Sequence, residues 1–141
     1  MVMWMSLGDR IKKFLGDNPK KLADEILKNM KEEYGDVPYI AKSMSERRPE
    51  TFIFNSLQTL FIIKQPKAVT PKVAELLAIA AATAIGCEHC IDFHVKQAME
   101  RFGASQDEIF DAMMIAGLIS QSSSLAVSLR KLDRISLSDS R

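Results

Sequence analysis

The chain has 141 residues, of which 47% are hydrophobic and 26% are charged, with a formal net charge of +1. Interspersed charges that nearly cancel give no support to binding of nucleic acid or of a membrane surface. The longest nearly apolar run, residues 76–85, is about half the length of a membrane-spanning helix. The first residues resemble neither a basic leader nor a signal-peptide core, so we expect a cytoplasmic protein.

The N-terminal third is expected to form helices, because its apolar residues recur at helical spacing. The pattern predicts helices over residues 6–15, 19–34 and 48–64. The second of these has Asn18 as its cap and Pro19 in its first position. Residues 36–45 are predicted to be a connector, since Pro38 disfavours helix in the residue before it.

The clearest helix start in the chain is Thr70-Pro71, a hydroxyl cap followed by proline where no amide donor is needed. The helix predicted over residues 72–85 is apolar nearly all round, which is typical of a buried helix. Gly86 ends it, and a second helix is predicted over residues 87–102.

A last helix is predicted to begin at a capping box in residues 105–108. A polar interruption or a bend is expected at residues 120–124, before helical spacing resumes. No segment alternates apolar and polar residues with period two, so the fold class is predicted to be all-α. We expect an N-terminal helical extension (1–45), a helical domain (46–135) and a flexible tail (136–141).

Both cysteines and both histidines of the chain lie within residues 87–94. On a helix, Cys87, Cys90 and His94 fall within about 60° of one another. The cysteines lie in the first turn, where free backbone amides stabilise a thiolate, and His94 lies one turn beyond Cys90. Such surroundings lower the pKa of a thiol, and the thiolate is the nucleophile of thiol redox chemistry. The window therefore predicts a redox-active dithiol.

Two arguments disagree about which sulfur attacks first. The helix terminus favours Cys87, whereas the imidazole favours Cys90, and spacing alone leaves both open. His89 lies roughly 140–160° from the face shared by Cys87 and His94, so only the loose first turn keeps it a candidate.

Glu75 is the remaining candidate, because a carboxylate in so apolar a helix is costly unless it is paired. An imidazole on the following antiparallel helix is a suitable partner. The two side chains differ in their distance from Gly86, so pairing with His94 requires a tilted crossing or an early helix end. Alternatively, Glu75 faces solvent beside Lys72.

Plainer interpretations exist for the same window. The cysteines could be two small buried apolar side chains. Cys87, Cys90, His94 and Glu75 could instead hold zinc, but structural zinc sites usually draw a second ligand pair from a distant knuckle. The chain has no other Cys or His to supply that pair.

Glu75, eleven intervening residues and then Cys-x-x-Cys-x-x-x-His resemble the active-site pattern of AhpD-like alkylhydroperoxidases. These proteins belong to the carboxymuconolactone decarboxylase superfamily. Residues 75–80 (ELLAIA) and 102–109 (FGASQDEI) are similar as well, and the resemblance covers roughly residues 48–118. It implies an AhpD-like multihelical bundle with the CxxC at the N-terminus of a buried-hairpin helix. It also implies a homo-oligomer, a trimer or a hexamer.

The resemblance implies a thiol-dependent peroxidase that reduces alkyl hydroperoxides with no bound cofactor. In that mechanism Cys90 attacks the peroxide, Cys87 resolves the product, and Glu75, His89 and His94 relay protons. An external dithiol or lipoyl-type protein is the expected reductant. The true decarboxylases typically lack the dithiol. Alternatives are a disulfide reductase and a redox-sensing stress-response module without peroxide turnover.

Overall fold

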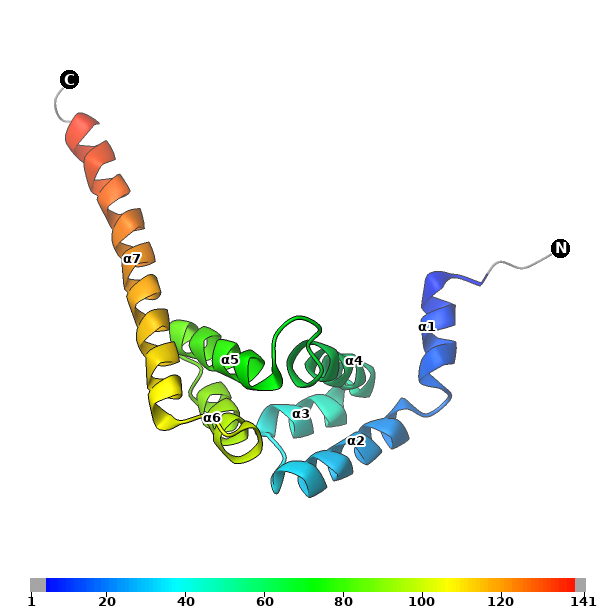
Figure 1. Ribbon diagram of the computed structural model, residues 1–141. Coiled ribbons are helices and arrows are strands. Elements are labelled where there is room, and N and C mark those ends of the chain that lie inside the picture. Colours follow the sequence, from blue (N-terminus) through cyan, green and yellow to red (C-terminus); the bar gives the residue numbers. More distant parts are fainter. Residues whose placement is uncertain (1–4, 139–141) are drawn as a thin grey trace. The chain divides into compact units, whose positions relative to one another are not determined.

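The computed structural model describes residues 5–138, and its regular elements there are all helical, which confirms the predicted all-α class. The elements in chain order are α1 (Leu7–Leu15), α2 (Pro19–Tyr34), α3 (Tyr39–Arg47), α4 (Pro49–Thr59), the π-helical turn η1 (Leu60–Lys64), α5 (Pro71–Ile85), α6 (Glu88–Phe102) and α7 (Gln106–Ser138) (Figure 1).

The chain divides by its internal contacts into two compact units, Met1–Ile62 and Ile63–Arg141. Each unit has its own hydrophobic core. The boundary predicted between residues 45 and 46 separates an N-terminal extension from a family domain. It does not concern internal contacts, and it stays a prediction.

The first unit packs α2, α3 and α4 around one cluster of buried side chains. Phe52 and Ile53 of α4 form its centre, at 1% and 2% exposure. The predicted connector over residues 36–45 is wrong, because α3 begins within it at Tyr39. Proline disfavours helix in the residue before it but is compatible with a helix that starts after it, and Pro38 is the N-cap here.

The second unit is a hairpin of α5 and α6 with α7 packed on α5. The hydroxyl of Thr70 accepts a hydrogen bond from the Val73 amide at 3.2 Å, as the predicted cap requires. Gly86 ends α5 in the left-handed conformation, with φ 70°, and the chain turns directly into α6. Ile79 and Ala98, both fully buried, hold the two helices of the hairpin together.

The last helix, α7, is longer than expected, and the predicted interruption at residues 120–124 is wrong. Its serines are accommodated by bonding back onto the helix. The Ser124 hydroxyl donates to the Ser120 carbonyl at 3.0 Å, and the Ser128 hydroxyl donates to the Ser124 carbonyl at 2.9 Å. Residues 136–138 of the predicted tail belong to α7, and residues 139–141 lie outside the described residues, so the flexibility of the tail stays a prediction.

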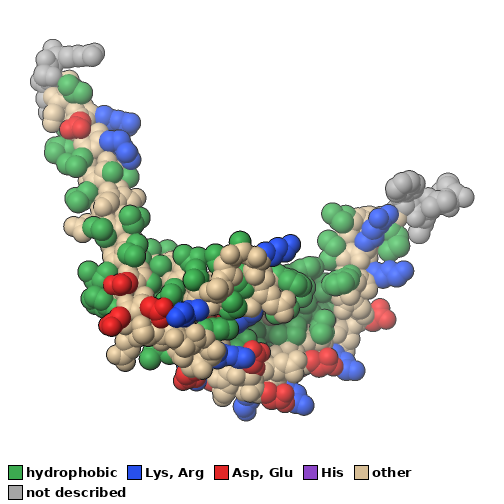
Figure 2. All heavy atoms as spheres, in the orientation of Figure 1, with side chains coloured by type: hydrophobic (Ala, Val, Ile, Leu, Met, Phe, Trp, Pro, Cys, Tyr) green, Lys and Arg blue, Asp and Glu red, His purple; other side chains and the backbone are tan. Residues whose placement is uncertain are grey.

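Large hydrophobic side chains remain exposed along α7 (Figure 2). They include Leu125, Leu129 and Leu132, each more than half exposed. The segment Gln106–Leu137 is, by length and composition alone, long and apolar enough to cross a bilayer, and 6% of its most apolar stretch is buried within the molecule. Exposed apolar surfaces of this extent are typical of sites that contact proteins or membranes.

Candidate redox site

The two cysteines are joined by a disulfide at the start of α6. Cys87 is the N-cap, Cys90 lies in the first turn, and their Cα atoms are 5.3 Å apart. The Cys87 amide donates to the Ala82 carbonyl at 2.9 Å, so the turn at Gly86 fixes where the dithiol begins. Both cysteines are partly exposed. The thiols are thus positioned to form and break a disulfide within a single helical turn.

Glu75 and His94 meet across the α5–α6 hairpin. Glu75 is fully buried, and its Oε2 lies 2.6 Å from His94 Nδ1. Glu75 therefore does not face solvent, and Lys72 instead pairs with Glu108 of α7 at 2.7 Å. A carboxylate can only accept a hydrogen bond, so His94 Nδ1 carries the proton. In the neutral ring, Nε2 is then the nitrogen that can accept a proton.

Lys64, the last residue of η1, is a third member of this cluster that the sequence did not reveal. Its Nζ lies 2.8 Å from Glu75 Oε1 and donates to Gln97 Oε1 at 3.3 Å. The Lys64 side chain is only 12% exposed. In the sequence it follows four apolar residues and resembles an ordinary helix-end lysine. The one available signal was the buried carboxylate itself, which needs more than a neutral imidazole to balance its charge.

Aromatic rings flank the cluster on the α6 side. The Lys64 ammonium lies 5.7 Å from the ring centroids of both Phe93 and Phe102, within range of a cation–π interaction. Phe93 also meets the His94 ring edge-on, with centroids 5.2 Å apart. These rings therefore provide an apolar border to the ion pair, and charges interact more strongly beside apolar groups than in water.

The charge of Glu75 reflects a balance of opposing effects. Burial alone raises the pKa of Glu75, but hydrogen bonds from His94 and Lys64, together with their positive charges, outweigh it and bring the pKa below 4.5. The carboxylate is therefore ionised at neutral pH and can orient the imidazole.

Cys90 and His94 are four residues apart on α6, so their side chains share one face, with Cβ atoms about 5–6 Å apart by helix geometry. His89, by contrast, is exposed. Within residues 5–138 no hydrogen bond joins His89 to Glu75, His94 or either cysteine. Its membership of a proton relay stays a prediction.

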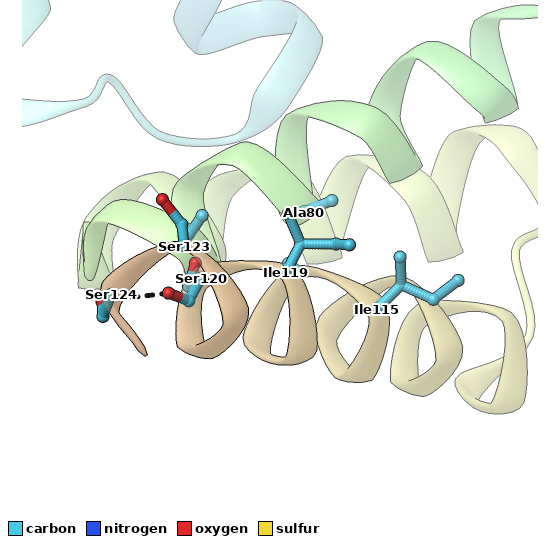
Figure 3. Close-up of a pocket in the computed structure, with 8 residues that line it drawn as sticks. Ala80, Ile115, Ile119, Ser120, Ser123 and Ser124 are labelled. Carbon is cyan, nitrogen blue, oxygen red and sulfur yellow. Dashed lines mark hydrogen bonds between the residues drawn. The ribbon is translucent and has the colours of Figure 1, made fainter. Parts of the chain in front are cut away.

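Two further features lie outside this cluster. In the described part of the chain, no group of three or more His, Cys, Asp and Glu side chains is arranged to hold a metal ion. An open hollow of about 540 Å³ lies between α5 and α7, lined by residues that include Ala80, Ile119 and Ser123 (Figure 3). The residues that line the hollow do not include Glu75, His94 or either cysteine, so the hollow is separate from this cluster.

A disulfide beside a buried carboxylate–imidazole pair, on an all-helical hairpin, defines a class of helical thiol–disulfide proteins. The family model described as "Carboxymuconolactone decarboxylase family" matches residues 55–133. This match spans more than half of the chain, so the protein belongs to that family, and it contains Lys64, Glu75, both cysteines and both histidines. Neither the curated proteins nor the solved structures that were searched gave a match.

Proposed function

We propose that the protein is a thiol-dependent peroxidase of the AhpD-like type, which reduces hydroperoxides through the Cys87–Cys90 pair. The observation that carries this proposal is the buried Glu75 carboxylate on His94, one helical turn from Cys90. This arrangement supplies a nucleophile, a base and a residue that orients the base.

In the first step the Cys90 thiolate attacks one oxygen of the hydroperoxide, and the O–O bond breaks. Cys90 becomes a sulfenic acid, and the leaving alkoxide, or hydroxide, takes a proton from the His94 imidazolium. Cys90 is assigned the attack because it lies one helical turn from His94, whereas Cys87, at the N-cap, lies about two turns away. Family resemblance supports the same assignment and adds His89 to the relay.

In the second step the Cys87 thiol attacks the sulfenic acid, forming the disulfide and releasing water. In the third step an external dithiol, on a protein or a lipoyl-type carrier, reduces the disulfide by exchange and is itself oxidised. No bound cofactor takes part. The partly exposed sulfurs are compatible with access by such a partner.

We also propose that the protein is a cytoplasmic homo-oligomer, a trimer or a hexamer, in which the exposed apolar side chains of α7 are covered by other copies. Neither nucleic acid nor a membrane is a proposed partner.

The test is peroxide consumption with a dithiol reductant, for the wild type, Cys90→Ser and Cys87→Ser. We expect turnover by the wild type, none by Cys90→Ser, and at most one equivalent consumed by Cys87→Ser without added thiol. Wild-type turnover no faster than that of Cys90→Ser would rule out a peroxidase.

The same proteins distinguish the alternatives. Reduction of insulin or DTNB without peroxide consumption would indicate a disulfide reductase. Formation of the disulfide with peroxide, but no turnover with any donor, would indicate a redox-sensing module.

A further inference from the structure

We propose that Lys64 is a positioning residue for the Glu75–His94 pair: it holds one carboxylate oxygen and offsets the carboxylate charge, so that Glu75 holds the His94 proton less tightly than it would alone. The inference deepens the proposed function and rests on it for its biological meaning. The effect of Lys64 on Glu75 and His94 can itself be measured without peroxide.

The geometry assigns the two carboxylate oxygens to different partners. Lys64 Nζ lies 2.8 Å from Oε1, and His94 Nδ1 lies 2.6 Å from Oε2. With Oε1 held by an ammonium, the carboxylate cannot turn away from the imidazole. The Gln97 oxygen, in a side chain that is 2% exposed, accepts a second hydrogen bond from Lys64 and fixes the ammonium in turn.

The charges explain why a cation is needed here. A buried carboxylate with His94 as its only partner would strongly favour the imidazolium form. Such a histidine would hold its proton too tightly to act as a base, or to release that proton to a leaving group. A catalytic acid–base works best when its proton affinity matches the working pH. Lys64 supplies a permanent positive charge on the far oxygen and so reduces the pull of Glu75 on the His94 proton.

The charged groups around Glu75 come from two elements. Lys64 approaches from η1 and His94 from α6. The helix α7, which also packs on α5, contributes Glu108, but that carboxylate is engaged by Lys72 at 2.7 Å. Gln97 is neutral. Lys64 therefore contacts Glu75 directly as a cation. Its charge is the same whether the two cysteines are dithiol or disulfide.

The position of Lys64 in the fold supports a dedicated role. It ends a π-helical turn, a rare conformation that is frequent at functional sites. Lys67, three residues later, is exposed. The chain thus offers a matched lysine outside the cluster for comparison.

The first experiment is a pH titration of the histidine rings by NMR in the oxidised protein, where no thiol titrates. The chain has only two histidines, so a His89→Asn variant assigns His94. We expect Nδ1 to carry the proton in neutral His94. In Lys64→Met the midpoint should rise by about one pH unit, a roughly tenfold gain in proton affinity. Lys64→Arg should restore the wild-type midpoint, and Lys67→Met should leave it unchanged.

The second experiment measures alkylation of Cys90 against pH in a reduced Cys87→Ser background, where Cys90 is the sole thiol. An imidazolium that persists to higher pH stabilises the neighbouring thiolate, so Lys64→Met should move the alkylation midpoint to lower pH. A higher His94 midpoint together with a lower Cys90 midpoint in Lys64→Met would show that Lys64 acts through its charge. A lysine that only supports packing would, when removed, loosen the Glu75–His94 contact, and the His94 midpoint would then fall instead of rise.

An unchanged or lowered His94 midpoint in Lys64→Met would overturn the inference. If Lys64→Met does not fold, Lys64→Arg is the deciding variant, because it keeps the positive charge. A His94 midpoint about one pH unit above or below that of the wild type in Lys64→Arg would also overturn the proposal. A wild type that consumes no peroxide while Lys64→Met shows the opposite shifts would refute the proposed function and leave the role of Lys64 intact.

Discussion

The Glu75 carboxylate and the His94 imidazole are joined at 2.6 Å although they lie 19 residues apart, on the two helices of one hairpin. The bond fixes which ring nitrogen carries the proton and which is left to accept one. Because Glu75 is fully buried, its carboxylate is shielded from competing water. The position of the imidazole is thereby set by packing between α5 and α6 and does not depend on a loop.

Replacement of His94 should remove the base without disturbing the dithiol. We expect His94→Asn to lower the rate of peroxide consumption by about 10²–10⁴-fold, the usual contribution of general acid–base catalysis. His89→Asn is the matched comparison, because His89 lies on the same helix but is exposed. Its loss should be less than about tenfold. Equal losses in the two variants would place His89 in the relay on the same footing as His94.

Stability should fall in acid because Glu75 is more acidic when folded. Burial opposes its charge, but His94 and Lys64 lower the pKa of Glu75 below 4.5 in the folded protein. The unfolded chain therefore binds this proton first, and the stabilisation present above about pH 4.5 is lost as the pH falls through the lowered pKa. Urea unfolding at pH 7, 4.5 and 3.5 measures the effect.

The control for that experiment is Glu108→Gln, because the pKa of Glu108 is also lowered, by hydrogen bonds from Lys72 and the Ser105 amide. If Glu75 dominates, Glu75→Gln should flatten the acid dependence more than Glu108→Gln does. A wild type equally stable at pH 7 and pH 3.5 would contradict the assignment of charge in the cluster.

Gly86 and Gly117 should respond to alanine in opposite directions. Gly86 has a φ of 70°, and open space surrounds the position of a Cβ atom, so Gly86→Ala should cost about 1–2 kcal/mol from backbone strain alone. Gly117 lies within α7, also with open space, and Gly117→Ala should stabilise the helix by about 0.5–1 kcal/mol. Thermal unfolding compares the two. Stabilisation by Gly86→Ala would show that the turn before Cys87 is not left-handed.

Association of copies should depend on the apolar side chains of α7. Leu125, Leu129 and Leu132 fall on one face of the helix and are exposed. We expect sedimentation to show an oligomer at micromolar concentration and Leu129→Lys to shift it toward smaller species. Val127→Lys is the control, because Val127 lies about 160° from Leu129 around the helix. A wild-type monomer would contradict the oligomer, and co-sedimentation with lipid vesicles would contradict the expectation of no membrane partner.

Much of the second unit could be predicted because its helix ends are set by local chemistry. Thr70 and Pro71 start α5, Gly86 ends it, and Gly103 ends α6. The missed helix α3 has a weaker local signal and is held by burial of Ala41 and Ser45 in the first unit's core. Packing of that kind is not visible in a single sequence.

The candidate site could likewise be predicted only in part. The contact between Glu75 and His94 could be anticipated from the sequence, because a carboxylate in an apolar helix needs a partner and the next helix offered one. Lys64 could not, because its place depends on a π-helical turn that no sequence pattern signalled. The serines of α7 led to the wrong prediction of an interruption at residues 120–124. Serines often lie at helix ends, but within a helix their hydroxyls can donate to the carbonyl one turn back.

The disulfide at the start of α6 has a consequence for how much the chain must move between its dithiol and disulfide states. Cys87 caps the helix and Cys90 lies in its first turn, so the two sulfurs can meet without any segment of the chain unwinding. The amides of α6 beyond Cys90 should exchange with deuterium equally slowly in the dithiol and disulfide states.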